Sequence, residues 1–243
     1  AKRIPLADGS VNCVVTSPPY YGLRSYLSEL HPMKKHELGA YQSVAEYINM
    51  IVEIGRELWR VLKNDGVFWL NIGDSYAGSN CGSNDYREDG KSISANSNKY
   101  QGQKPGLQAG YKRKDLMLIP HRVAMALQDD RWWVRSDIVW WKNGVPESVK
   151  DRPTSAHEYV FLLTKSEHYW YDYEAVKTPT KGNEHDKRAR VARKRFPTKT
   201  VSGIRKTGYY PMANLRDVWK VNTVPYLGNH YAAFPPKLVE ICI

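Results

Sequence analysis

Short runs of β-branched and aromatic residues alternate with amphipathic segments along this chain, and this alternation restricts its fold most. Residues 11–16 (VNCVVT) and 67–72 (VFWLNI) have the length and composition of buried strands. Between them, residues 42–63 carry apolar side chains at helical spacing, and the turn sequence NDG follows at 64–66. Strands that alternate with helices predict an open α/β sheet.

The second half of the chain continues the pattern. A helix is expected over 115–128, and strands are expected over 132–141 and 158–164. Because no helical segment separates these two strands, we expect an antiparallel hairpin at one edge of the sheet. Two prolines at 235–236 predict the start of a final helix over 237–243.

Two polar stretches divide the chain into regions. Residues 77–114 are rich in Gly, Ser, Asn, Lys and Gln, which predicts a long polar loop. Residues 172–215 are punctuated by Pro and Gly and carry much of the net charge of +11. The expected organisation is therefore a core at 1–171, a basic insert at 172–215 and a last region at 216–243.

The basic insert is the strongest indication of a partner. Ten Lys or Arg residues lie between 181 and 206, against Glu184 and Asp186. Such a segment suits a polyanion, because neutralising phosphates releases counterions, although a solvated basic loop is the alternative. We favour nucleic acid and expect phosphate contacts, which position a protein without specifying sequence, from Arg188, Arg190, Arg193, Lys194 and Arg195.

The composition argues against several other classes of protein. Cys13, Cys81 and Cys242 are far apart and lack any C-x-x-C spacing, which disfavours a disulfide framework or a zinc site. No apolar run approaches the roughly 20 residues that a membrane span needs. The first residues also lack the apolar segment of a signal peptide. We expect a cytoplasmic protein with neither a metal nor a membrane partner.

The segment Ser17-Pro18-Pro19-Tyr20 directly follows the first expected strand, where open α/β sheets bind ligands. Two prolines stiffen the turn and donate no N–H, so it offers oxygen acceptors: the Ser17 hydroxyl and the carbonyls of Ser17 and Pro18. Acceptors beside the Tyr20 ring could hold a flat, amino-bearing base that has left its stack. An acceptor would also draw the amino lone pair out of conjugation. The alternative is a strand-ending turn with a buried tyrosine.

In its context this segment resembles motif IV of the DNA amino-methyltransferases, which modify N4 of cytosine or N6 of adenine. Residues 66–76 (GVFWLNIGDSY), 131–143 and 146–165 resemble the strands that follow in the family. Residues 230–243 (HYAAFPPKLVEICI) resemble the segment that precedes the cofactor loop in the circularly permuted, or beta, class.

The resemblance implies a Rossmann-like sheet that uses S-adenosyl-L-methionine, and it assigns roles to the three regions. Residues 1–171 would be the catalytic core, 172–215 the target-recognition insert, and 216–243 the start of the cofactor-binding region. Double-stranded DNA would be the substrate, and a restriction endonuclease in a prokaryote or phage a candidate partner.

By the same resemblance, Asn71 and Asp74 lie near the cofactor or the target base, and Phe234 and Pro235 touch the edge of the cofactor. The alternatives are local turn capping for the first pair and a helix start packed on the sheet for the second. The family's F-x-G-x-G cofactor loop is absent and is expected after Ile243. We therefore expect truncation at the C-terminus, with a non-catalytic homologue as the less favoured alternative.

Serine at the first position of the motif is more typical, by resemblance, of cytosine-N4 enzymes, whereas adenine enzymes usually carry aspartate. We therefore expect a site-specific DNA methyltransferase that methylates the exocyclic amino group of a flipped base, with cytosine N4 favoured. The alternatives are an adenine-N6 methyltransferase or a catalytically silent DNA-binding fragment.

Overall fold

The computed structural model describes residues 3–23, 27, 30–39, 42–77, 110–144, 147, 149–179, 212–224 and 233–243. These fall into two compact units, residues 1–170 with 217–243 and residues 171–216.

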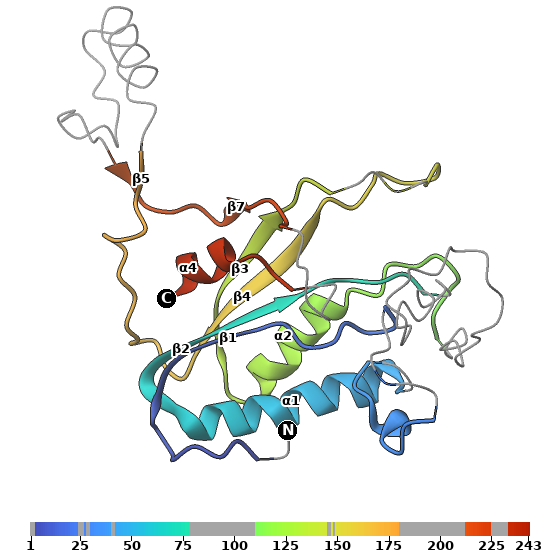
Figure 1. Ribbon diagram of the computed structural model, residues 1–243, viewed down its shortest axis with the longest axis horizontal. Coiled ribbons are helices and arrows are strands. Elements are labelled where there is room, and N and C mark those ends of the chain that lie inside the picture. Colours follow the sequence, from blue (N-terminus) through green and yellow to red (C-terminus); the bar gives the residue numbers. More distant parts are fainter. Residues whose placement is uncertain are drawn as a thin grey trace, which may run out of the picture. The chain divides into compact units, whose positions relative to one another are not determined.

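The first unit is built on a five-stranded mixed sheet, shown in Figure 1. The strand at one edge runs parallel to its neighbour, and the strand in the middle runs antiparallel to both of its neighbours. This sheet with its helices confirms the predicted α/β class. In spatial order the strands are β1 (Val11–Thr16), β2 (Leu62–Ile72), β4 (His157–Thr164), β3 (Trp133–Trp141) and β7 (Val218–Lys220).

Helices α1 (Val44–Val61) and α2 (Ile119–Asp130) lie together on one side of the sheet (Figure 1). They form one hydrophobic core with alternate side chains of the strands, including Phe68, Leu70 and Phe161. The first turn of α1 is closed by a capping box, in which Ser43 and Glu46 each accept the other's backbone N–H.

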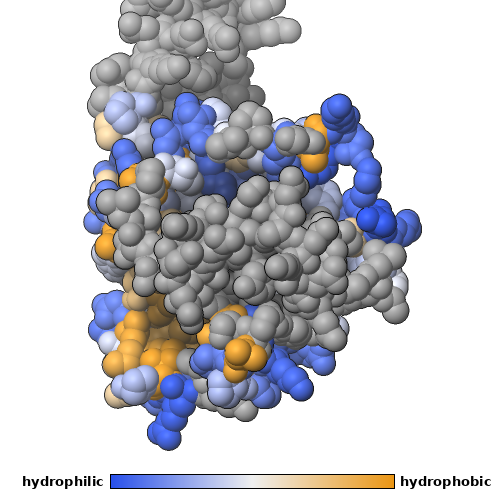
Figure 2. Space-filling model, turned by 45° about the vertical axis from the view of Figure 1, so that its right-hand side comes forward, coloured by the Kyte–Doolittle hydropathy of each residue, from blue (hydrophilic) through white to orange (hydrophobic). Residues whose placement is uncertain are grey.

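The opposite face of the sheet is covered by the last segments of this unit. Trp69 of β2 meets Trp219 of β7 there, with ring centroids 5.8 Å apart. Helix α4 (Pro236–Cys242) lies on the same face, since the Sγ of Cys13 is 3.6 Å from the carbonyl oxygen of Cys242. No helix of the described ranges is long and apolar enough to cross a membrane. Figure 2 shows hydrophobic residues gathered in one area of a surface that also carries many hydrophilic ones.

The predicted turn at 64–66 is wrong, because β2 already begins at Leu62 and runs through these residues. The pairing of β1 with β2 slips between Val11 and Cys13, so the NDG sequence forms an irregularity within the strand. A Cβ at Gly66 would lie 2.8 Å from the carbonyl oxygen of Asn12, so this position requires glycine.

The start predicted for the second helix is also wrong, since α2 begins at Ile119 and not at residue 115. The residues before it pair with the chain that leaves β2. Tyr76 bridges Leu116, and the Met117 N–H donates to the Ser75 carbonyl at 3.0 Å. Long-range pairing has replaced the first helical turn that the local pattern favoured.

The predicted hairpin exists, because β3 and β4 pair antiparallel from Trp133↔Thr164 to Trp141↔His157. Its predicted place at the edge of the sheet is wrong. β7 pairs parallel with β3 and takes that edge. A strand of three residues, Val218–Lys220, is too short to leave a period-two pattern in the sequence.

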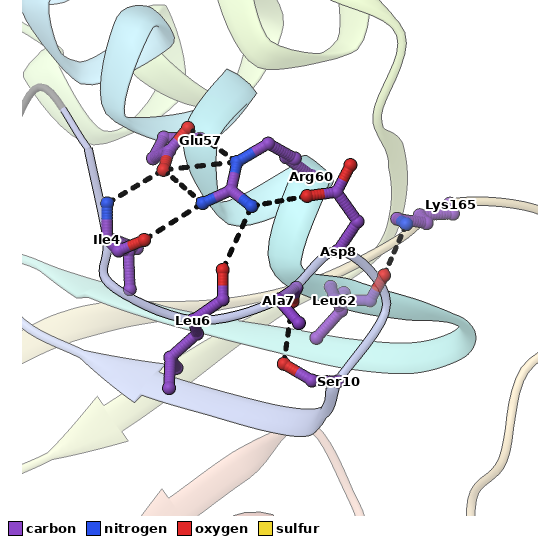
Figure 3. A network of polar contacts seen from close by, with 9 residues as sticks. All are labelled: Ile4, Leu6, Ala7, Asp8, Ser10, Glu57, Arg60, Leu62 and Lys165. Atoms are coloured by element: carbon purple, nitrogen blue, oxygen red, sulfur yellow. Dashed lines mark hydrogen bonds and ion pairs between the residues drawn. The ribbon is translucent and has the colours of Figure 1, made fainter.

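The segment before β1 is fastened to α1 by a polar network, which we call the N-terminal staple (Figure 3). Arg60 donates to the carbonyls of Ile4 and Leu6, at 2.9 and 3.0 Å, and to the carboxylates of Asp8 and Glu57. Glu57 in turn accepts the Ile4 N–H at 2.7 Å. The staple therefore places the chain for its entry into β1.

Only the two ends of the second unit are described. Strands β5 (Thr178–Pro179) and β6 (Met212–Ala213) pair antiparallel, and Asp172 Oδ1 accepts two backbone N–H groups in a turn. The bounds of the unit, 171–216, lie one residue from those of the predicted insert. Its role in target recognition stays a prediction. Nearly all of the predicted polar loop 77–114 lies outside the described residues. So do the five DNA-contact candidates, Arg188, Arg190, Arg193, Lys194 and Arg195.

Candidate active site

The segment Ser17–Tyr20 leaves the sheet at the carboxyl end of β1, beside the carboxyl end of the parallel strand β2. The chain after β2 begins with Gly73, which lies against the Tyr20 ring. A Cβ at Gly73 would lie 2.6 Å from Cε2 and 2.9 Å from Cδ2 of that ring. The ring can take this position only because residue 73 has no side chain.

The backbone of the segment is anchored from α1. Tyr47 is fully buried, at 0% exposure, and its hydroxyl donates to the carbonyl of Pro19 at 2.9 Å. Burial raises the pKa of Tyr47, so the phenol keeps the proton that it donates. One hydrogen bond from the core thus ties the backbone of the turn to α1.

The Tyr20 hydroxyl lies at the centre of a second polar network. It donates to Glu158 Oε2 of β4 at 2.5 Å, and its oxygen is 2.9 Å from Asn71 Oδ1 of β2. The Ser17 hydroxyl donates to the Tyr20 hydroxyl oxygen at 3.3 Å, which is long for a hydrogen bond between two oxygens. Side chains from three strand ends therefore meet at one phenol.

Neighbouring groups orient both acceptors. Asn71 Nδ2 donates to Glu158 Oε2 and to the carbonyl of Tyr159, both at 3.1 Å. Lys142, directly after β3, forms an ion pair with Glu158 Oε1. The side chains of Lys142 and Glu158 are 24% and 15% exposed, so the pair is shielded from solvent. We call Ser17, Tyr20, Asn71, Lys142 and Glu158 the Tyr20 cluster.

Burial raises the pKa of Tyr20 well above its ordinary value, and the adjacent Glu158 carboxylate raises it further. The phenol is therefore neutral at physiological pH, and it carries a single proton to donate. A buried hydrogen bond to a carboxylate is stronger than one between neutral groups.

Asp74 caps α2 from outside the helix. Its Oδ1 accepts the N–H of Ser75 at 2.8 Å and that of Ile119, the first residue of α2, at 3.0 Å. Burial raises the pKa of Asp74, and these N–H groups and His121 oppose the shift. The geometry is that of the capping alternative, and the role of Asp74 near the cofactor or base stays a prediction.

The other predicted cofactor residues are also placed by the structure. Asn71 lies in the Tyr20 cluster, with its amide bonded on both sides. Phe234 is half-buried, and Pro235 is buried at the cap of α4. The structure thus brings Asn71 to the motif, and places Phe234 and Pro235 at a helix start on the sheet. Their contact with a cofactor stays a prediction.

Residues 11–243 match the model of a DNA methylase family, N6_N4_Mtase. The chain belongs to this DNA methylase family. It is 43% identical over 243 residues to the type II methyltransferase M.XycI of Xanthomonas campestris pv. cyanopsidis, and equally to M.Cfr9I of Citrobacter freundii. Each match covers 100% of this chain and 67% of the relative, so the chain spans about two thirds of their length.

A solved structure supports the same fold for this DNA methylase. PvuII DNA methyltransferase (cytosine-N4-specific) superposes with a TM-score of 0.54 at 16% identity. The match covers 98% of this chain and 64% of that one. The family therefore confirms the amino-methyltransferase resemblance. The circularly permuted class, the Rossmann-like details and the position of a cofactor loop stay predictions.

Sequence reasoning missed the residues that hold the motif in place: Tyr47, Gly73, Lys142 and Glu158. A weak signal did exist for Glu158, since a carboxylate near the start of the apolar run HEYVFLLT must find a partner where the strand becomes buried. Nothing local marks Tyr47 or Gly73. Among the described residues, no group of three or more His, Cys, Asp or Glu could hold a metal ion.

Proposed function

We propose that this DNA methylase is a site-specific methyltransferase that acts on the exocyclic amino group of a base flipped out of double-stranded DNA, with cytosine N4 as the favoured target. One observation carries the proposal. The Ser17–Tyr20 segment is held rigidly at the carboxyl end of β1, with oxygen acceptors and an aromatic ring anchored from three other elements. That combination suits a planar base with an amino group at its edge.

The roles of the residues follow from their chemistry. The Ser17 hydroxyl and the Pro18 carbonyl accept the two amino hydrogens, and the face of the Tyr20 ring stacks on the base. Both acceptors polarise the amino group and leave its lone pair directed at the methyl donor. Because the turn is anchored before substrate arrives, most of the catalytic gain comes from positioning.

S-adenosyl-L-methionine supplies an electrophilic methyl group when bound. The candidate residues suit it by type, since Asp74 carries a carboxyl group that would pair with a cationic cofactor and Phe234 offers a half-buried aromatic ring to a purine. Asn71 is a candidate as well, although its amide already orients Tyr20 and Glu158.

We assign DNA-backbone contact to the basic insert, through Arg188, Arg190, Arg193, Lys194 and Arg195. The relatives are named type II methyltransferases, which supports a restriction endonuclease as the functional partner of this protein.

The proposal is tested by incubating the complete protein with S-adenosyl-L-methionine and duplex DNA, followed by nucleoside mass spectrometry. N4-methylcytosine would support the favoured target, and N6-methyladenine would replace it with the adenine alternative. DNA binding with no methylated nucleoside would favour a silent DNA-binding protein.

A substitution of Ser17 tests the role of the motif in methyl transfer. Ser17→Ala should lower turnover on the order of a hundredfold while DNA affinity stays nearly intact, because the lost acceptor acts on the reacting amino group. Ser10→Ala is the matched control, since that hydroxyl only bonds the Ala7 carbonyl before β1. Normal turnover with weakened DNA affinity in Ser17→Ala would remove Ser17 from the chemistry.

A further inference from the structure

Three polar groups of the Tyr20 cluster form a chain of hydrogen bonds. The Ser17 hydroxyl is 3.3 Å from the Tyr20 oxygen, which is 2.5 Å from Glu158 Oε2. Ser17 is the residue that meets the target amino group in the proposed function, whereas Glu158 comes from β4, on the far side of β2. The hydrogen-bond chain therefore connects the reacting position to the Glu158 carboxylate, which does not itself touch the base.

The protons that these groups carry decide which of them donates in each hydrogen bond of the chain. A carboxylate only accepts hydrogen bonds, and a phenol has one proton to donate. The contact of Tyr20 with Glu158 is shorter than its contact with Asn71, so the phenol proton lies mainly toward the carboxylate. The Tyr20 oxygen then presents lone pairs, and the Ser17 hydroxyl can only donate to it.

We propose that Glu158, ion-paired with Lys142, sets the direction of this hydrogen-bond chain so that Ser17 turns its proton toward Tyr20 and its lone pairs toward the target amino group. Glu158 is thus a positioning residue that acts through Tyr20, and the inference rests on the proposed function. Without the carboxylate, the Ser17 hydroxyl can rotate and point its own proton at an amino hydrogen of the base, so it no longer accepts a hydrogen bond there.

The surroundings keep the chain in this state. The raised pKa of Tyr20 leaves its proton in place, and the shielded site strengthens each charge-assisted bond. The Lys142–Glu158 pair belongs to the base of the β3–β4 hairpin, where the Lys142 N–H donates to the Ala156 carbonyl at 2.8 Å and Trp140 faces Glu158 across the ladder. The charge is therefore held by a paired sheet and not by a loose surface contact.

The test is a double-mutant cycle in the complete protein. Glu158→Gln keeps the shape but adds a donor, and Tyr20→Phe keeps the stacking ring but removes the link. Each should lower kcat about tenfold to a hundredfold, with the KM values for DNA and cofactor within about threefold of wild type. Because both act on one chain, the double variant should be no slower than the slower single variant.

Two further measurements separate this role from a structural one. Glu167→Gln, the same substitution in the exposed bend that follows β4, should leave kcat unchanged. The fluorescence of 2-aminopurine at the target position should report normal base flipping in Tyr20→Phe, because the ring is retained.

Wild-type kcat in either single variant, additive losses in the double variant, or a change confined to KM would overturn the inference. If Glu158→Gln does not fold, Tyr20→Phe alone decides, and wild-type kcat in that variant rejects the chain. These results are distinct from failure of the proposed function, in which the wild-type protein itself would transfer no methyl group.

Discussion

Two polar networks flank the same strand, and they are built differently. The N-terminal staple precedes β1, and its Arg60 guanidinium binds two backbone carbonyls and two carboxylates at the protein surface. The Tyr20 cluster follows β1 and consists of shielded side chains, where the Tyr20 hydroxyl donates its one proton toward Glu158.

The difference separates stability from chemistry. In the staple, several bonds share the same task, so losing one leaves the segment before β1 attached. In the Tyr20 cluster each link has a single proton and a defined direction, so one substitution changes what Ser17 offers to a substrate. We therefore expect changes in the cluster to alter turnover, and changes in the staple to alter stability alone.

The largest effect should come from filling the space that the Tyr20 ring occupies. Gly73→Ala would place a methyl group 2.6 Å from Tyr20 Cε2, forcing the ring and its hydroxyl to move. We expect a loss of about 1–3 kcal/mol in the free energy of unfolding from overpacking. Methyl transfer should fall on the order of a hundredfold from misplacement of the ring.

Thermal unfolding and steady-state kinetics measure both effects. Gly144→Ala is the matched control, because a Cβ there meets nothing within 4 Å, and it should behave as wild type. Full activity in Gly73→Ala would show that the cluster tolerates displacement as the staple does, and the comparison between the two networks would fail.

A smaller effect should follow from removing the anchor of the motif backbone. Tyr47→Phe deletes the bond to the Pro19 carbonyl in a fully buried place, so the unfolding free energy should fall by about 1–2 kcal/mol and kcat severalfold. Tyr21→Phe is the control, since its hydroxyl donates to the Gln42 carbonyl at 3.1 Å, outside the motif. Chemical denaturation should show a loss in both variants. An equal loss of kcat in both would contradict a specific anchor.

The smallest effect should appear in the staple, where it should change stability and its dependence on pH. Hydrogen bonds from Arg60, first, and from the Ile4 N–H hold the pKa of Glu57 at about 2, against an ordinary 4.5. Because folding lowers the pKa of Glu57, its charged carboxylate stabilises the fold at pH values above 4.5. This contribution is lost as the pH falls from 4.5 toward about 2. Glu57→Gln should reduce stability at neutral pH, flatten the acid loss and leave kcat unchanged.

Unfolding measured across this pH range tests the prediction, with Glu53→Gln on the same helix as the control. A fall in kcat in Glu57→Gln would mean that the staple also acts on the site, and that the two networks are not independent.

Where the sequence predicted the fold correctly, the signal was local. The periodicity of residues 44–61 and the apolar runs of β1 and β2 identify these elements without reference to the rest of the chain. The start of α2 was missed because residues 116 and 117 pair with 75 and 76, across a long segment. The three-residue strand β7 exists only because β3 offers it an edge.

The candidate site divides in the same way. The sequence by itself determined the Ser17–Tyr20 segment, its stiffness and its position after a strand, because these depend on neighbouring residues. The tertiary structure alone decided what holds that segment. Tyr47 and Glu158 are 28 and 138 residues away from the atoms that they bind. Contacts over such separations arise from the packing of α1 and the order of the strands, and no local preference encodes them.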